Sequence, residues 1–168
     1  SDLITKNFKV GDPVKFSISM TPNAEKLKMG LTGGAVLLKD GKIPSGFSHI
    51  PEGTTSTNNP RTAVGTSKDG KKLIMVTVDG RQKISTGLTL YDLAVLMKEI
   101  GCHNAVNLDG GGSTTMVARK TASTNLEVVN SPSESSLRNV ATAIGVFSIA
   151  PPGELEGLVI DTVDKNVF

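Results

Sequence analysis

The sequence predicts an α+β fold: a mixed, mostly antiparallel sheet with one main helix packed on a face. Short apolar runs separated by turn residues recur along the chain, and only the stretch 89–100 has clear helical periodicity. The 18 glycines and 8 prolines among 168 residues are typical of a turn-rich protein. We expect one domain at 1–150, and 151–168 as a linker or the start of a further module.

Alternating or short apolar runs mark the strands, and we expect a sheet of five or more. The predicted strands are a half-buried run at 14–18, residues 35–38, 61–66, 72–79, a run through Ala105-Val106 ending at Asp109, 114–118 and a buried strand at 139–149. Asp69-Gly70 between two of these runs indicates a hairpin. Residues 39–42 read as a turn, and 44–60 and 119–137 as loops.

The stretch 89–100 carries helix signals at both ends. Thr89 is the expected N-cap, with Asp92 three residues later as an acidic variant of the capping box. Gly101 is the expected C-terminal stop. The apolar positions expected to face the core are Leu93, Leu96, Met97 and Ile100.

Composition excludes several functional classes. A net charge of +2, one Tyr, no Trp and no basic cluster interleaved with aromatic residues argue against nucleic-acid binding. No apolar run is long enough to cross a bilayer. The single Cys102 excludes an internal disulfide and a cysteine-based zinc site, and neither His49 nor His103 has a partner at metal-ligand spacing.

The run 107–115, Asn-Leu-Asp-Gly-Gly-Gly-Ser-Thr-Thr, is the most informative motif. Asp109 ends a strand, and the three glycines that follow expose a bare backbone whose N–H groups can hold an anion. A carboxylate beside an anion-binding loop suggests acid/base chemistry on a phosphate- or sugar-bearing substrate. A tight corner between two strands remains the structural alternative.

Several motifs together resemble the phosphodiester glycosidase family in order and spacing, over about residues 30–149. They are Asn59–Gly65, Val78–Arg81, Gly87–Leu90, Asn107–Ser113 and Arg138–Val140. The resemblance implies a hydrolase that cleaves the glycosidic bond of a sugar-1-phosphodiester, on an extracellular glycan or wall polymer. Family members carry additional sequence upstream. We therefore expect this chain to be a C-terminal portion, with the missing N-terminal portion of its domain as a partner.

A phosphate leaving group needs charge stabilisation more than protonation, and guanidinium groups supply it. Asp109 is the first catalytic candidate, as nucleophile or base, and Asp79 is the second carboxylate. The candidates for binding phosphate or substrate are Arg61, Arg81, Arg138, Gly110, Gly111, Gly112 and Ser113. The structural alternatives are a turn-capping Asp109, an ordinary turn residue at Asp79, and arginines that are surface cations.

The sequence requires no cofactor and predicts no metal site. Calcium is the cation that Asp109, Asp79 and loop carbonyls would suit. Ser113 lacks the context of a serine nucleophile. Besides the hydrolase, two alternatives stay open: a non-catalytic glycan- or phosphate-binding module of a surface protein, and a fragment inactive alone.

Overall fold

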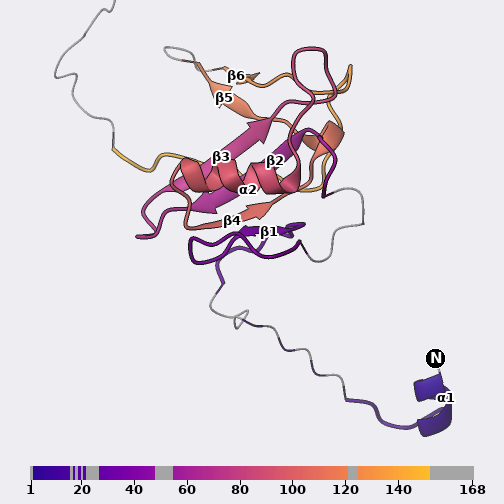
Figure 1. Cartoon of the computed structure of the whole chain (residues 1–168). Helices are drawn as coiled ribbons and strands as arrows, with labels where there is room; N and C mark the ends of the chain where they lie inside the picture. The colour runs from indigo at the N-terminus through magenta and orange to yellow at the C-terminus, as the bar shows by residue number, and fades with distance from the viewer. Residues whose placement is uncertain are drawn as a thin grey trace, which may run out of the picture.

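The structure is a computed structural model that describes residues 2–15, 17, 19, 21, 27–47, 55–120 and 125–151. Its elements are α1 (Asp2–Asn7), β1 (Val36–Leu38), β2 (Arg61–Thr66), β3 (Leu73–Val78), α2 (Leu90–Glu99), β4 (Asn104–Asn107), the 3-10 turn η2 (Gly111–Ser113), β5 (Val117–Arg119) and β6 (Leu126–Val128). Four strands form one sheet in the order β1-β4-β2-β3, and β5 pairs with β6. Helix α2 lies across one face of the larger sheet (Figure 1).

The sheet is built on the predicted hairpin. Strands β2 and β3 pair from Arg61 opposite Val78 to Thr66 opposite Leu73, and β4 pairs with the other side of β2. Every strand pairing among the described residues is antiparallel, so the α+β class is confirmed. The larger described sheet has four strands, fewer than the five or more expected, because β5 and β6 form their own pair.

The caps of α2 match the prediction, but its buried face is shifted. The Thr89 hydroxyl accepts a hydrogen bond from the Asp92 N–H at 3.1 Å, and Gly101 has a left-handed φ of 94°. Leu90, Leu93, Ala94 and Met97 form the buried stripe. Ile100 was expected in the core, but it is 42% exposed because it lies at the C-cap, beyond the last helical turn.

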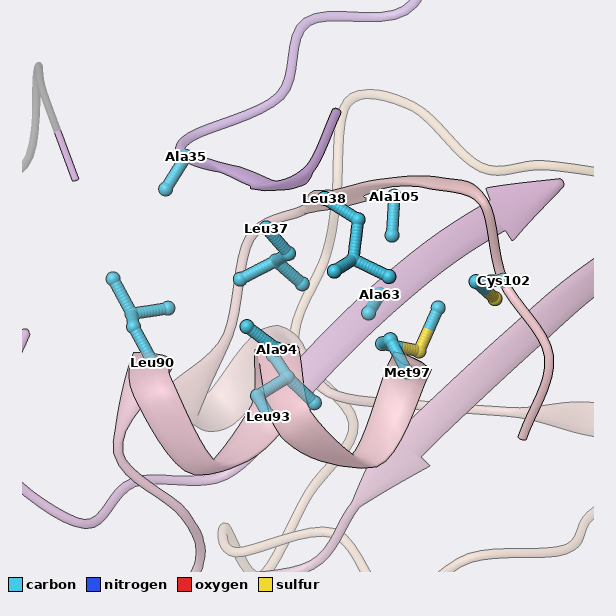
Figure 2. Packing of buried hydrophobic residues seen from close by; sticks show 10 residues of the cluster. All are labelled: Ala35, Leu37, Leu38, Ala63, Leu90, Leu93, Ala94, Met97, Cys102 and Ala105. Carbon is cyan, nitrogen blue, oxygen red and sulfur yellow. The ribbon is translucent and has the colours of Figure 1, made fainter. Parts of the chain in front are cut away.

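The core lies between α2 and the inner face of the sheet. Ala94 and Met97 project from the helix toward Leu37 and Leu38 of β1 (Figure 2), and Leu93 belongs to the same cluster. The small residues Ala63 and Ala105 line the sheet beneath them and let the helix approach closely. Cys102 belongs to this cluster, and its burial raises the pKa of the thiol.

Two expectations for the C-terminal part were wrong. Residues 126–128 were expected in a loop, but they form β6, which pairs with β5 from Val117 opposite Val128 to Arg119 opposite Leu126. Residues 139–149 were expected to be a buried strand, but they adopt no regular structure and Phe147 is 86% exposed. Alternation alone does not make a strand, since no neighbouring strand in the described chain pairs with this segment.

The outer face of the sheet, opposite α2, is apolar and partly exposed. Val64 lies opposite both Met75 and Val106, and Val106 lies opposite Val36, so these four side chains form one row across the sheet. Val36 is 48% and Met75 41% exposed. A cavity of about 330 Å³ lies over this face. None of the helices described is both long and apolar enough to span a membrane.

Candidate active site

A cleft of about 500 Å³ gathers most of the predicted site residues. It lies where β2 begins and β4 ends, against the glycine motif. Its lining residues are Thr32, Gly33, Gly34, Asn59, Pro60, Arg61, Arg81, Asn107, Leu108, Asp109, Gly110, Gly111, Gly112 and Arg138. Three arginines and one aspartate among them give the lining an excess of positive charge at neutral pH.

Close backbone packing explains why the motif needs glycine. The Gly111 N–H donates to the Pro60 carbonyl at 3.0 Å, and a Cβ on Gly110 would lie 2.7 Å from that same oxygen. Gly111 has a left-handed φ of 60°, which disfavours any residue with a side chain. The motif is thereby held directly against the segment that leads into Arg61.

The glycine motif uses three of its N–H groups within the protein, and its predicted anion nest stays a prediction. The N–H groups of Gly111, Ser113 and Thr114 donate to the carbonyls of Pro60, Gly110 and Gly111. The last two of these bonds close a 3-10 turn, and all three donors are already used within the protein. Ser113 is absent from the lining of the cleft.

Arg61 is a buried cation in the cleft wall. Its residue is 4% exposed, and its guanidinium donates to the carbonyls of Leu88 and Thr57, both at 2.9 Å. Burial, and then the nearby positive charge of Arg81, lower the pKa of Arg61. Two guanidinium groups that repel each other in this way favour an anion between them.

Arg81 is exposed and is held by a neutral partner. Its Nε and Nη2 atoms both donate to Asn59 Oδ1, at 3.2 and 2.9 Å. Its backbone has a left-handed φ of 56°, which is uncommon for a residue with a long side chain. The guanidinium lies against Gly111, where a Cβ would be 3.3 Å from an Nη atom. The guanidinium group of Arg81 is thereby held in the lining of the cleft.

Arg138 reaches the cleft from the C-terminal loop and forms an ion pair with Glu134. Both side chains lie against Gly112, where any Cβ would clash with them. The third glycine of the motif thus makes room for this pair. The pair brings a second carboxylate, that of Glu134, next to the glycine motif.

The two predicted catalytic carboxylates lie in different surroundings. Asp109 lines the cleft. Asp79 does not, and its two oxygens accept hydrogen bonds from Asn130 Nδ2 and the Ser131 N–H, each at 2.9 Å. This arrangement gives Asp79 a structural role that the sequence did not suggest, as the anchor of the loop that carries Arg138, while its catalytic role stays a prediction.

A metal ion gains no support from this geometry. Among the described residues, no group of three or more His, Cys, Asp or Glu side chains could hold an ion. Asp79 and Asp109, which were assigned to calcium together, do not share the cleft. His103 lies outside the cleft lining, and His49 lies outside the described residues.

Three residues near the cleft were assigned no role from the sequence. Asn59 and Asn107 each lie within a motif that carried the family resemblance, so their position in the sequence could have indicated a role in the site. Glu134 lies in a polar stretch with no pattern, and only the fold brings it to Gly112. Asn107 is buried and Asn59 fixes Arg81, so both help to shape the site.

The sequence model of the phosphodiester glycosidase family matches residues 4–147. The chain belongs to the phosphodiester glycosidase family. The match begins well before residue 30, where the resemblance was expected to start. Every residue that lines the cleft therefore falls within the part of the chain that this family accounts for.

This phosphodiester glycosidase domain is similar to parts of longer proteins. It is 42% identical over 81 residues to the SPbeta prophage-derived protein YomE of Bacillus subtilis, covering 48% of this chain and 12% of the relative. It is 43% identical over 61 residues to the mouse N-acetylglucosamine-1-phosphodiester alpha-N-acetylglucosaminidase, covering 36% of this chain and 11% of the relative. The chain thus spans only a small part of these curated relatives.

Among solved structures, the zebrafish N-acetylglucosamine-1-phosphodiester alpha-N-acetylglucosaminidase catalytic domain, auto-inhibited by its pro-peptide, is 35% identical to this chain. The likeness covers 51% of this chain and 31% of that one, with a TM-score of 0.41. Family membership rests on the sequence match over residues 4–147.

Proposed function

We propose that this domain takes part in hydrolysing the glycosidic bond of sugar-1-phosphodiesters, with Asp109 as nucleophile or base. The observation that carries the proposal is the cleft itself. Its lining includes one residue with a carboxylate, Asp109, together with Arg61 and Arg81, which supports the proposal. Family membership supplies the reaction class.

The charge of the cleft suits the chemistry of this bond. When the anomeric carbon separates from phosphate, negative charge remains on the phosphate oxygens. Arg61 and Arg81 bring permanent positive charge to those oxygens, and the fixed position of Arg61 requires little reorganisation. Asp109 can then stabilise or attack the positive anomeric centre on the other side of the bond.

A second function is favoured by a specific observation: the described cleft lining contains a single carboxylate, whereas most glycosidases use two. A non-catalytic module that binds glycan or sugar phosphate would need only the arginines. A third proposal is that the N-terminal portion of a longer domain completes the site. Extracellular or cell-surface location is also a proposal, based on the family resemblance.

The deciding experiment compares wild type and Asp109→Asn on a panel of sugar-1-phosphodiesters, measuring sugar release and binding. We expect the variant to lose turnover by about 10²-fold or more while it retains binding. Asp40→Asn is the matched control, because it removes one carboxylate outside the cleft lining, at a left-handed φ of 51° that Asn tolerates.

The other outcomes separate the alternatives. Full turnover by Asp109→Asn would contradict the catalytic role of Asp109. Binding without turnover by folded wild type would favour the binding module. Neither binding nor turnover, with both restored in a longer polypeptide of the same protein, would favour completion by an N-terminal portion.

A further inference from the structure

Asn107 carries a buried acceptor without a partner. The residue is 5% exposed, and its Oδ1 atom has no hydrogen-bond partner in the part of the chain that the structure describes. Its Nδ2 donates to the Leu108 carbonyl at 2.8 Å. That bond fixes the orientation of the amide, because exchanging the oxygen and nitrogen would place two acceptors against each other.

The backbone of Asn107 is anchored on the strand that leads to Asp109. Its carbonyl accepts from the Gly34 N–H at 2.7 Å, and its N–H donates to the Ala35 carbonyl at 2.8 Å. The residue ends β4 opposite Ala63, which is two residues from Arg61 on β2. Alternation along a strand puts Arg61 and Asn107 on the same face of the sheet. Both line the cleft.

An unpaired buried oxygen is a cost that calls for an explanation. Leaving a buried acceptor unsatisfied costs about 1–3 kcal/mol, so native structures seldom keep one without a reason. None of the three arginines that line the cleft donates a hydrogen bond to this oxygen. An N–H or O–H group that enters the cleft with a ligand would satisfy this oxygen.

We propose that Asn107 is a specificity-determining residue whose Oδ1 accepts a hydrogen bond from an O–H or N–H group of the glycosyl unit. This inference rests on the proposed function: the arginines bind the phosphate, and Asn107 recognises the neutral sugar attached to it. The substrate class is then a sugar phosphodiester whose ring carries a donor within reach of this oxygen. A site built around such a bond discriminates strongly against analogues that lack the donor.

The test measures kcat/KM for wild type and for an Asn107 variant, each on the same set of substrate analogues, so that the two losses can be compared. Wild type and Asn107→Leu are assayed on one glucosyl phosphodiester, on its four monodeoxy analogues, and on the 2-acetamido analogue. We expect one deoxy analogue to lose about tenfold or more in kcat/KM with wild type. Asn107→Leu should lose a similar factor on the parent substrate and nothing further on that analogue.

Two further variants separate recognition from folding. Asn104→Leu removes an amide from the other end of the same strand, where its Oδ1 already accepts the Asp40 N–H at 2.9 Å. It should keep the wild-type dependence on the deoxy analogue. Asn107→Asp retains an acceptor oxygen and should restore part of the discrimination that Asn107→Leu loses. Thermal unfolding of each variant establishes that it is folded.

The failures of the two proposals differ. Suppose that wild type hydrolyses the parent substrate, and that for every analogue the loss in kcat/KM from Asn107→Leu simply adds to the loss from removing the hydroxyl. That result would overturn the role of Asn107 and leave the proposed function standing. If wild type binds without turnover, the proposed function fails and the same comparison is measured in Kd. If neither this folded chain nor a longer polypeptide of the same protein binds or hydrolyses any member of the panel, both proposals are overturned.

Discussion

Several backbone segments around the cleft pack against one residue, Pro60. It is fully buried, its carbonyl accepts the Gly111 N–H at 3.0 Å, and Gly80 and Gly110 both pack against it. Proline fixes φ and cannot donate a backbone hydrogen bond, so this contact is made through its carbonyl and its ring. The position of Arg61, the next residue, therefore depends on glycines that are distant in sequence.

The variant Gly110→Ala tests whether the close contact between Gly110 and Pro60 constrains the site. The new Cβ would lie 2.7 Å from the Pro60 carbonyl oxygen, so the backbone must shift at a cost of about 1–3 kcal/mol. We expect a lower Tm and weaker phosphodiester binding. Gly30→Ala is the control, because its Cβ meets nothing within 4 Å. Equal behaviour of the two variants would show that the contact does not constrain the site.

At the scale of elements, α2 holds the inner face of the sheet in place. Its buried stripe runs through Leu90, Leu93, Ala94 and Met97 at the spacing of one helical face. The same sheet face continues beyond the core to Arg61 and Asn107. Packing of the helix on Ala63 and Ala105 thus positions the strands that carry the cleft.

Leu93→Ala and Ile100→Ala measure which face of the helix is buried. Leu93 is 0% exposed, and its truncation should lower the free energy of unfolding by about 2–5 kcal/mol. Ile100 is 42% exposed, and its truncation should cost about 0.5 kcal/mol. The measurement is urea unfolding followed by circular dichroism. Comparable losses at both positions would mean that the helix packs on the face that the sequence predicted.

For the whole molecule, the notable feature is the asymmetry of the larger sheet. Its inner face is covered by α2 (Figure 1). Its outer face presents the row of Val36, Val64, Val106 and Met75. Exposed apolar surface on this scale promotes association. The outer face is therefore where association of the isolated chain should begin.

Met75→Lys tests whether the outer face stays uncovered in solution. Met75 is 41% exposed, so a charge there should change the free energy of unfolding by no more than about 0.5 kcal/mol and should reduce self-association. Sedimentation and thermal unfolding measure the two effects. Ile74→Lys is the matched control, since Ile74 packs against the core and its replacement should be strongly destabilising. A large loss of stability in Met75→Lys would mean that another surface covers this face.

The sequence by itself determined the local features of this protein. The hairpin of β2 and β3, the caps of α2 at Thr89 and Gly101, and the family motifs all depend on residues close together in the chain. Short-range turn chemistry and capping bonds involve few residues, so their patterns can be recognised directly. The α+β class follows from the same local signals.

Only the tertiary structure decided which of these features meet. It placed Asp109 in the cleft and Asp79 in a loop contact, and it used three N–H groups of the glycine motif within the protein. It gave 139–149 no strand partner among the described residues. The contacts that build the site join groups far apart in sequence, such as Asp79 with Ser131 and Pro60 with Gly110. A hydrogen-bonding group has the same appearance in a sequence whether a distant carbonyl or a ligand satisfies it, and only the folded chain distinguishes the two.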